Sequence, residues 1–232
     1  MNKINDRSAA IKKMVLCGVF TALAYVCVCV FRIKVSFLTL DIKDAVITTG
    51  AMLISPIAGL AVSAVVALIE MITISDTAYY GLIMNFLSSA TFSVVASVIY
   101  RKGKTLVFAV IGLVTAACSV TAVMMLANLF ITPYFMGATT KAVISLIPKL
   151  LLPFNLTKAV LNAALVMLIY KPISTALSRA GVIKKAQVEK QSSYKLGVKT
   201  LTVTLGAVAV LVICFVIFFI VLGAEVQLFN IK

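Results

Sequence analysis

Long apolar stretches, separated by short polar ones, follow one another from residue 12 to residue 222 of this sequence. A helix of about 20 apolar residues crosses the hydrocarbon core of a membrane, and it satisfies its own backbone hydrogen bonds there. We therefore expect an all-α integral membrane protein, with a bundle of six helices and an additional C-terminal transmembrane helix. The predicted helices are residues 12–31, 45–54, 57–74, 81–100, 105–130, 153–170 and 201–222.

The apolar stretch from residue 45 to residue 74 has two possible interpretations, one long helix or two helices divided near Ser55, Pro56 and Gly59. A single helix would place the basic cluster at residues 101–104 outside the cell, against the tendency of positive charge to remain inside. A division at Pro56 returns this cluster to the cytoplasm. We expect the division, although a helix of about ten residues cannot cross a full bilayer alone.

Charge then orients the chain. With the division, fourteen of the 21 lysines and arginines lie on the cytoplasmic side, together with the N-terminus. The net charge of +14 is spread over short flanks beside apolar helices, where membrane orientation and anionic lipid explain it. We expect membrane lipid, and not nucleic acid, as the partner of these charges.

The polar stretches also suggest how the chain is divided. We expect a substrate-binding membrane domain over residues 1–175, a basic cytoplasmic linker over residues 176–199, and the extra helix with a short tail over residues 200–232. The turn-prone residues 131–137 predict a break after the fifth helix. Residues 139–152, with an internal proline, predict a broken or tilted helix at the outer surface.

Catalytic chemistry has little support. The chain has no histidine, its five cysteines lie in apolar segments, and no metalloprotease or serine-hydrolase motif is present. The sequence Gly103-Lys104-Thr105 resembles the end of a phosphate-binding loop, but Val98 stands where that motif needs glycine. We expect no enzymatic activity, no metal site, no cofactor and no ATPase in this chain.

A polar face interrupts the sixth predicted helix. Asn155, Lys158 and Asn162 are spaced i, i+3 and i+7, so they share one face, and Asn128 lies at the end of the preceding helix. Amide side chains together with an amine suit a neutral heterocycle with alternating donors and acceptors, because each asparagine offers both. An alternative explains the same residues equally well, since lysine snorkels to headgroups and asparagines bond neighbouring helices.

Other residues complete the candidate site. Asp41 and Asp44 stand at the start of the second predicted helix, where favourable charge at a helix N-terminus explains them. Gly18 and Ala22 form a small-xxx-small pair, which allows close helix contact but is common by chance in membrane helices. Aromatic residues near the expected mouth are suited to the apolar walls of a pocket: they are Phe37, Tyr79, Tyr80, Tyr134, Phe135 and Phe154.

Several of these segments together resemble a known family. The runs at residues 37–44, 55–60, 69–71 and 82–86 resemble the S components of energy-coupling factor (ECF) vitamin transporters. The late segment, with Asn128, residues 132–137 and residues 153–158, is similar to the riboflavin-specific RibU members. The resemblance extends over about residues 10–175, and the last predicted helix departs from the six-helix pattern.

The resemblance implies a six-helix S component in a bacterial cell membrane that captures riboflavin outside. It implies partners as well, a membrane T component and two ATPase subunits that use the ATP, with Gly18 and Ala22 as the nearest match to the family's docking pair. It places ligand contacts in the first loop and at Asn128, Asn155 and Lys158. The full set of candidate substrate-binding residues is Asn128, Asn155, Lys158, Leu40, Asp41, Asn85, Phe154 and Asn162.

Two other functions stay open. The first is the same family with another ligand, which could be FMN, a flavin analogue or another vitamin. Lys141 and Lys149 near the mouth leave room for a phosphorylated flavin. An autonomous secondary carrier or a small membrane enzyme would show paired ionisable groups at mid-bilayer depth. For a riboflavin site, we expect alanine at Asn155 or Lys158 to weaken binding and to leave the protein folded.

Overall fold

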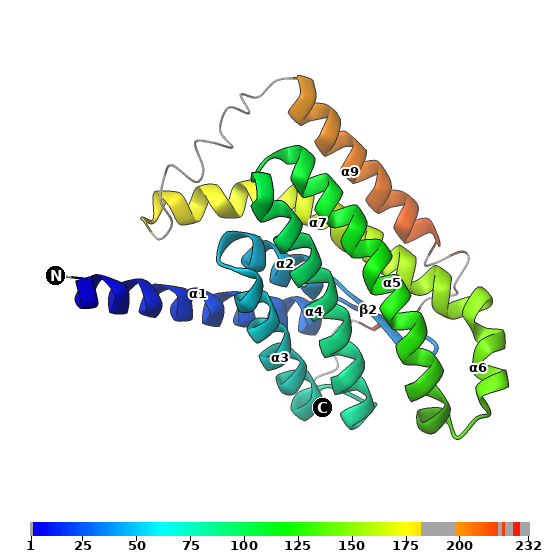
Figure 1. The fold of residues 1–232 in the computed structure, drawn as a ribbon. Coiled ribbons are helices and arrows are strands. Elements are labelled where there is room, and N and C mark those ends of the chain that lie inside the picture. The colour runs from blue at the N-terminus through cyan, green and yellow to red at the C-terminus, as the bar shows by residue number, and fades with distance from the viewer. Residues whose placement is uncertain (1, 182–197, 218–219, 221–224, 228–232) are drawn as a thin grey trace.

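The computed structural model describes residues 2–181, 198–217, 220 and 225–227. Within them, five helical stretches are long and apolar enough to cross a membrane. Figure 1 shows three of them, Pro56–Thr73, Ala78–Gly103 and Leu106–Met136, side by side, and the N-terminal half of helix α1 (Asn2–Val30) extends beyond the bundle. The described stretches are Ala10–Val30, Pro56–Thr73, Ala78–Gly103, Leu106–Met136 and Thr140–Arg179. The mostly helical membrane fold that the apolar runs predict is confirmed.

The division near Pro56 is confirmed. Helix α2 (Lys43–Leu53) ends before it, and α3 (Pro56–Thr73) begins at the proline itself. Proline suits a first helical turn because its missing N–H has no partner there anyway, and the Ser55 hydroxyl accepts a hydrogen bond from the Ala58 N–H. Ten of the eleven residues of α2 are buried, so this short helix lies inside the bundle.

The loop predicted between α1 (Asn2–Val30) and α2 is a β-hairpin. Strand β1 (Arg32–Val35) pairs in antiparallel fashion with β2 (Leu38–Asp41), and Ser36 at the turn has a positive φ of 56°. Ile33, Val35 and Leu40 are fully buried on one face. We did not predict this hairpin from the sequence, although residues 32–35 (Arg-Ile-Lys-Val) and 38–41 (Leu-Thr-Leu-Asp) alternate polar and apolar side chains, which is the pattern of a half-buried strand.

The break predicted at residues 131–137 is wrong over most of its length. Helix α5 (Leu106–Met136) continues through Pro133 and ends at Gly137, which adopts a left-handed φ of 60°. A proline so close to a helix end removes a single backbone hydrogen bond. The Pro133 carbonyl then accepts the N–H groups of Gly137 and Ala138, which closes the last turn.

The next segment is a broken helix, as predicted, but it runs directly into the following one. Helix α6 (Thr140–Leu146) passes through a π-helical turn (Ile147–Leu151) into α7 (Leu152–Arg179). Helix α7 does not end near Tyr170 but continues to Arg179, so the proposed boundary at residue 175 falls within a helix. Ser174 and Ser178 are buried and Ile173 and Leu177 pack on the core, which holds Pro172 within the helix.

The core has three parts. Helix α4 (Ala78–Gly103) packs along α5 and α7 around Phe92, Ala96 and Tyr100. A second cluster joins α1, α2 and α3 around Phe20, and a third joins the hairpin to α7. Helices α4 and α5 approach each other closely, since a Cβ added at Gly112 would lie 2.8 Å from the Ala96 carbonyl oxygen.

The additional C-terminal helix is seen only in part. Helix α9 (Val198–Val216) lies along α7 (Figure 1), and its apolar portion, Leu205–Val216, is shorter than the five long stretches. A short strand, β3 (Glu225–Gln227), pairs with β1, which gives a sheet of order β2-β1-β3. Most of the predicted linker, residues 182–197, lies outside the described residues, and a seventh membrane crossing stays a prediction.

Candidate functional site

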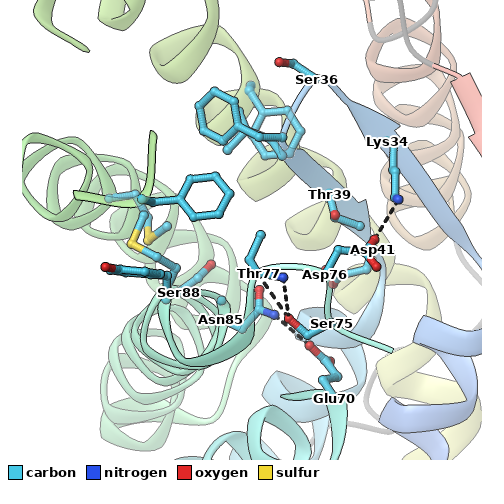
Figure 2. Close-up of a pocket in the computed structure, with 18 of the residues that line it drawn as sticks. Lys34, Ser36, Thr39, Asp41, Glu70, Ser75, Asp76, Thr77, Asn85 and Ser88 are labelled. Carbon is cyan, nitrogen blue, oxygen red and sulfur yellow. Dashed lines mark hydrogen bonds and ion pairs between the residues drawn. The ribbon is translucent and has the colours of Figure 1, made fainter. Parts of the chain in front are cut away.

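A cavity of about 330 Å³ lies between the hairpin and helices α3, α4, α5 and α7. This volume is within the range of small-molecule sites. Figure 2 shows that the polar groups around it come from the hairpin, from α3, from the α3–α4 loop and from α4. Segments far apart in the sequence therefore share one pocket.

Six of the eight predicted substrate-binding residues line this cavity. Asn128 comes from α5, Asn85 from α4 and Asp41 from β2. The beginning of α7 supplies the other three, Phe154, Asn155 and Lys158. The spacing argument placed Asn155 and Lys158 on one face of α7, and both line the same cavity as Asn128 of α5.

Leu40 and Asn162 are not among the lining residues. Leu40 is fully buried and packs in the cluster between the hairpin and α7. The Asn162 amide oxygen accepts the Ala45 N–H at 2.9 Å, and its nitrogen donates to the Asp41 carbonyl at 3.2 Å and the Lys158 carbonyl at 3.0 Å. Asn162 therefore fastens the start of α2 to α7, which is the packing alternative considered for this polar face.

The two remaining amides are held by their own helices. The Asn128 nitrogen donates to the Met124 carbonyl, and its oxygen accepts the Thr132 hydroxyl. The Asn155 nitrogen donates to the Leu151 carbonyl at 2.8 Å. These bonds fix the rotamers of both amides at the wall of the cavity.

Lys158 does not snorkel to the surface. Its ammonium donates to Asp41 Oδ2 at 2.9 Å and to the Thr39 carbonyl at 3.4 Å, and the residue is buried. Burial alone would raise the pKa of Asp41, but the ammonium groups of Lys158 and Lys43 outweigh it and hold this pKa below its ordinary value. Asp41 is therefore a carboxylate in the folded protein.

The ion pair extends to a third helix. Lys43 Nζ lies 3.6 Å from Asp41 Oδ2 and donates to Glu70 Oε2 at 2.7 Å. Glu70 Oε2 also accepts a hydrogen bond from the Asn85 amide at 2.8 Å, a contact visible in Figure 2. We call Asp41, Lys43, Asp44, Glu70 and Lys158 the buried charge cluster, since each is less than a tenth exposed.

Asp44 has a different role from the one its position suggests. It lies in the first turn of α2, as the helix-dipole argument requires, but it is buried and accepts a hydrogen bond from the Ser89 hydroxyl of α4. Asp41 precedes the helix and pairs with Lys158. Both acids therefore make specific contacts between elements in addition to any interaction with the helix dipole.

At the mouth, two contacts fasten the hairpin to the segment between α3 and α4. Lys34 and Asp76 form an ion pair at 2.8 Å, which Figure 2 shows from the side of the cavity. The Arg32 guanidinium donates to the Ile74 carbonyl at 2.8 Å. These two contacts thus hold the hairpin against the segment between α3 and α4 at the mouth of the cavity.

An aromatic group forms the apolar part of the wall. The ring of Phe135 lies 6.2 Å from that of Phe37 and 5.8 Å from that of Tyr80, which joins the hairpin turn to α4 and α5. Phe154 lines the cavity as well. Tyr79 stacks on Tyr80 but does not line the cavity, and Tyr134 is 79% exposed.

The predicted docking pair lies elsewhere, on the outer face of α1. Gly18 and Ala22 are both exposed. A Cβ added at Gly18 would meet nothing within 4 Å. This face is therefore accessible in the described part of the chain.

Sequence reasoning missed Lys43 and Glu70. Neither is among the candidate site residues, although an ionisable side chain within or beside an apolar segment usually marks a functional or paired position. That signal was present in the sequence, but the partners could not be identified. Within the described residues, no group of three or more histidine, cysteine or acidic side chains is arranged to hold a metal ion.

Comparison with known proteins identifies the fold. The family model for the substrate-specific component of ECF transporters matches residues 12–170. A solved structure, described as "Structure and mechanism of the S component of a bacterial ECF transporter", is similar with 25% identity and a TM-score of 0.62. The match covers 72% of this chain and 98% of the solved one. Among curated proteins, none matches this chain.

Proposed function

Because the chain belongs to the family of ECF transporter substrate-specific components, we propose that it is a riboflavin-binding member, which captures the vitamin outside the cell for delivery inward. S components are transport proteins and not enzymes, and they work with an ECF module of T and ATPase subunits. ATP is then consumed by the module, and riboflavin is cargo and not a cofactor.

The cavity is the observation that carries this proposal. Its aromatic side, formed by Phe37, Tyr80 and Phe135, suits the face of a fused-ring heterocycle. Asn128, Asn155 and Lys158 add polar groups at the edge, and such a ring presents both donors and acceptors to amides. Apolar walls with a few oriented polar groups are typical of small-molecule sites.

A titration of flavin fluorescence tests the proposal. Riboflavin added to the purified protein in detergent is expected to lose fluorescence until about one equivalent is bound. Asn155→Ala is the informative variant, because its amide lines the cavity and is bonded only to its own helix among the described residues. Absence of quenching at micromolar riboflavin would contradict the proposal.

The structure changes the expectation for Lys158. Removing its ammonium would leave Asp41 with Lys43, at 3.6 Å, as the remaining cation near its carboxylate. Breaking a buried ion pair is strongly destabilising. We therefore expect Lys158→Ala to lose folded protein as well as riboflavin, so this variant does not separate binding from folding.

The phosphorylated flavin is a weaker candidate. Lys141 and Lys149, the basic residues that favoured it, do not line the cavity. The cationic side chains that do line it are engaged: Lys34 with Asp76, Arg32 with Ile74, and Lys158 with Asp41. None is left without a partner for a phosphate.

An ion-coupled carrier is the second candidate function, and the buried charge cluster is the observation that favours it. Paired ionisable groups inside a membrane protein mark ion or proton pathways in many transporters. Here, however, the groups lie at the ends of α2, α3 and α7 and bind one another. Riboflavin uptake by cells that lack the ATPase module would support the carrier, and uptake that requires the module would exclude it.

A further inference from the structure

Strand β3 completes the sheet that lines the cavity. It pairs with the edge of β1 that β2 leaves free, and Val226 lies opposite Ile33 in this ladder. A two-stranded hairpin alone is only marginally stable, and an unpaired strand edge leaves backbone groups without partners. The pairing with β3 therefore stabilises the hairpin in the position that the structure shows.

Helix α9 holds the same hairpin through apolar contacts. The ring of Phe215 meets that of Phe31 edge to face, with the ring centroids 5.9 Å apart, directly before β1 begins. Cys214 is buried in the apolar cluster that also contains Ile33 and Leu40 of the hairpin. Two described elements near the C-terminus thus contact one hairpin, and we call α9 and β3 together the C-terminal strap.

Strand β1 also carries the polar contacts at the mouth of the cavity. Lys34 pairs with Asp76, and Arg32 donates to the Ile74 carbonyl. The side chains of the ion pair are 31% and 43% exposed, and an exposed ion pair contributes little to stability. Apolar burial and an aromatic contact contribute more, so the strap adds a restraint that this ion pair does not provide.

The position of the hairpin decides what the restraint does. Both strands and the turn between them line the cavity, so a movement of the hairpin away from the segment between α3 and α4 would open the cavity at its mouth. The opening of such a covering element often sets the rate at which a bound molecule leaves.

We propose that the C-terminal strap keeps the hairpin closed over the cavity and thereby slows release of the bound ligand. The effect on release rests on the proposed function, whereas the restraint on the hairpin does not depend on the identity of the ligand. The strap lies beyond residue 170, where the match to the family model ends. This restraint is therefore additional to the region that the chain shares with the family.

The first test measures amide hydrogen exchange by mass spectrometry in the full-length protein without ligand. Phe215→Ala removes the ring contact with Phe31, and we expect exchange over residues 32–41 to become about tenfold faster. Ile213→Ala is the matched control, because Ile213 also lies on α9 but is 58% exposed. Its hairpin should exchange as in the unaltered protein, and the amides of α4 and α5 serve as an internal reference.

A second variant weakens the strap through the backbone and leaves the contacts of α9 in place. The N–H groups of a strand point alternately to its two sides, so the double variant Val226→Pro, Gln227→Pro removes at least one donor that faces β1. Exchange in the hairpin should again become faster. The double variant Val226→Ala, Gln227→Ala keeps every backbone donor and is the control.

The third measurement is the release of radiolabelled riboflavin, chased with an excess of unlabelled riboflavin. Phe215 is not among the residues that line the cavity, so its substitution leaves the ligand contacts in place. We expect Phe215→Ala to release the vitamin about tenfold faster than Ile213→Ala, because release requires the same opening of the hairpin.

The possible results separate the two proposals. Hairpin exchange as slow in both strap variants as in their controls overturns the strap, and riboflavin binding by the unaltered protein then still supports the proposed function. Exchange that becomes equally faster in α4 and α5 shows that α9 stabilises the whole bundle, which also overturns the strap. Faster hairpin exchange with unchanged release overturns the control of release. If the unaltered protein binds no riboflavin, the proposed function is overturned, while faster exchange confined to the hairpin still supports the restraint.

Discussion

At the scale of single residues, the buried charge cluster is the most demanding feature of the molecule. Each ion loses its hydration on folding, and only mutual attraction and hydrogen bonds offset that loss. Lys43 is the centre of the cluster because its ammonium lies within 4 Å of both Asp41 and Glu70. It is 1% exposed, so water cannot replace it.

Replacing Lys43 with methionine is expected to destabilise the protein by about 3–5 kcal/mol, because it leaves Glu70 without its cation in a buried site. The measurement is thermal unfolding in detergent, followed by intrinsic fluorescence or loss of monodisperse protein. Lys102→Met, at an exposed position, serves as the control. The double variant Lys43→Met, Glu70→Gln should recover part of the lost stability, because it removes both members of the pair. If Lys43→Met alone is as stable as Lys102→Met, the ion-pair account is contradicted.

Asn155 and Asn162 share a helical face but have different roles. Asn162→Ala removes two hydrogen bonds that join α7 to α2 and to the hairpin, and one within α7. Each unpaired buried group costs about 1–3 kcal/mol. We expect this variant to unfold at a lower temperature. Asn155→Ala should keep its stability and bind riboflavin about tenfold more weakly, equivalent to one hydrogen bond.

Paired unfolding and fluorescence titrations of the two variants distinguish these roles. The opposite pattern, with a stable Asn162→Ala protein of weak affinity, would assign Asn162 to the ligand site instead.

At the scale of elements, close packing of α4 against α5 depends on one glycine. A Cβ at Gly112 would meet the Ala96 carbonyl oxygen at 2.8 Å, and a backbone atom cannot move aside as a flexible side chain can. Overpacking of this kind typically costs about 1–3 kcal/mol. We expect Gly112→Ala to lower the unfolding temperature.

Gly18→Ala is the matched control for this substitution. It lies on an open face of α1, where the added methyl group meets nothing within 4 Å, and alanine favours a helix more than glycine does. Its unfolding temperature should be unchanged or slightly higher. Equal effects of both substitutions would show that helix propensity, and not the α4–α5 contact, decides the outcome.

At the scale of the whole molecule, the ligand site and the proposed docking face lie on different parts of the bundle. The cavity lies under the hairpin, whereas Gly18 and Ala22 lie on the outer face of α1. If both proposals hold, ligand binding and association with the ECF module are expected to be altered separately.

Bulky residues on α1 test this separation. Ala22→Leu and Gly18→Leu are expected to lower riboflavin uptake and co-purification of the T and ATPase subunits, because close helix contact requires small side chains. Quenching by the purified subunit should stay unchanged. Leu23→Ala is the control, because Leu23 is also exposed on α1 and the substitution removes bulk; it should leave uptake intact. Loss of flavin binding in the leucine variants would contradict a docking role.

Much of this architecture follows from the sequence because its cause is local. Apolar length placed the long helices, and Pro56 with Ser55 placed the boundary between α2 and α3, since capping and proline geometry depend on adjacent residues. Helical spacing predicted that Asn155 and Lys158 share a face, and both line the cavity. Pro133 and Pro172 show the limit, because packing and capping keep the helices intact where local preference predicts a break.

What only the tertiary structure decided is the pairing of distant groups. Asp41 meets Lys158 across 117 positions of sequence, and Lys43 meets Glu70 across 27. The position of Asn162 between α7, α2 and the hairpin depends on such contacts as well. A single sequence records which charges are present in an apolar chain, but their partners are set by the packing of the bundle, because an ion pair is an interaction through space and carries no local pattern.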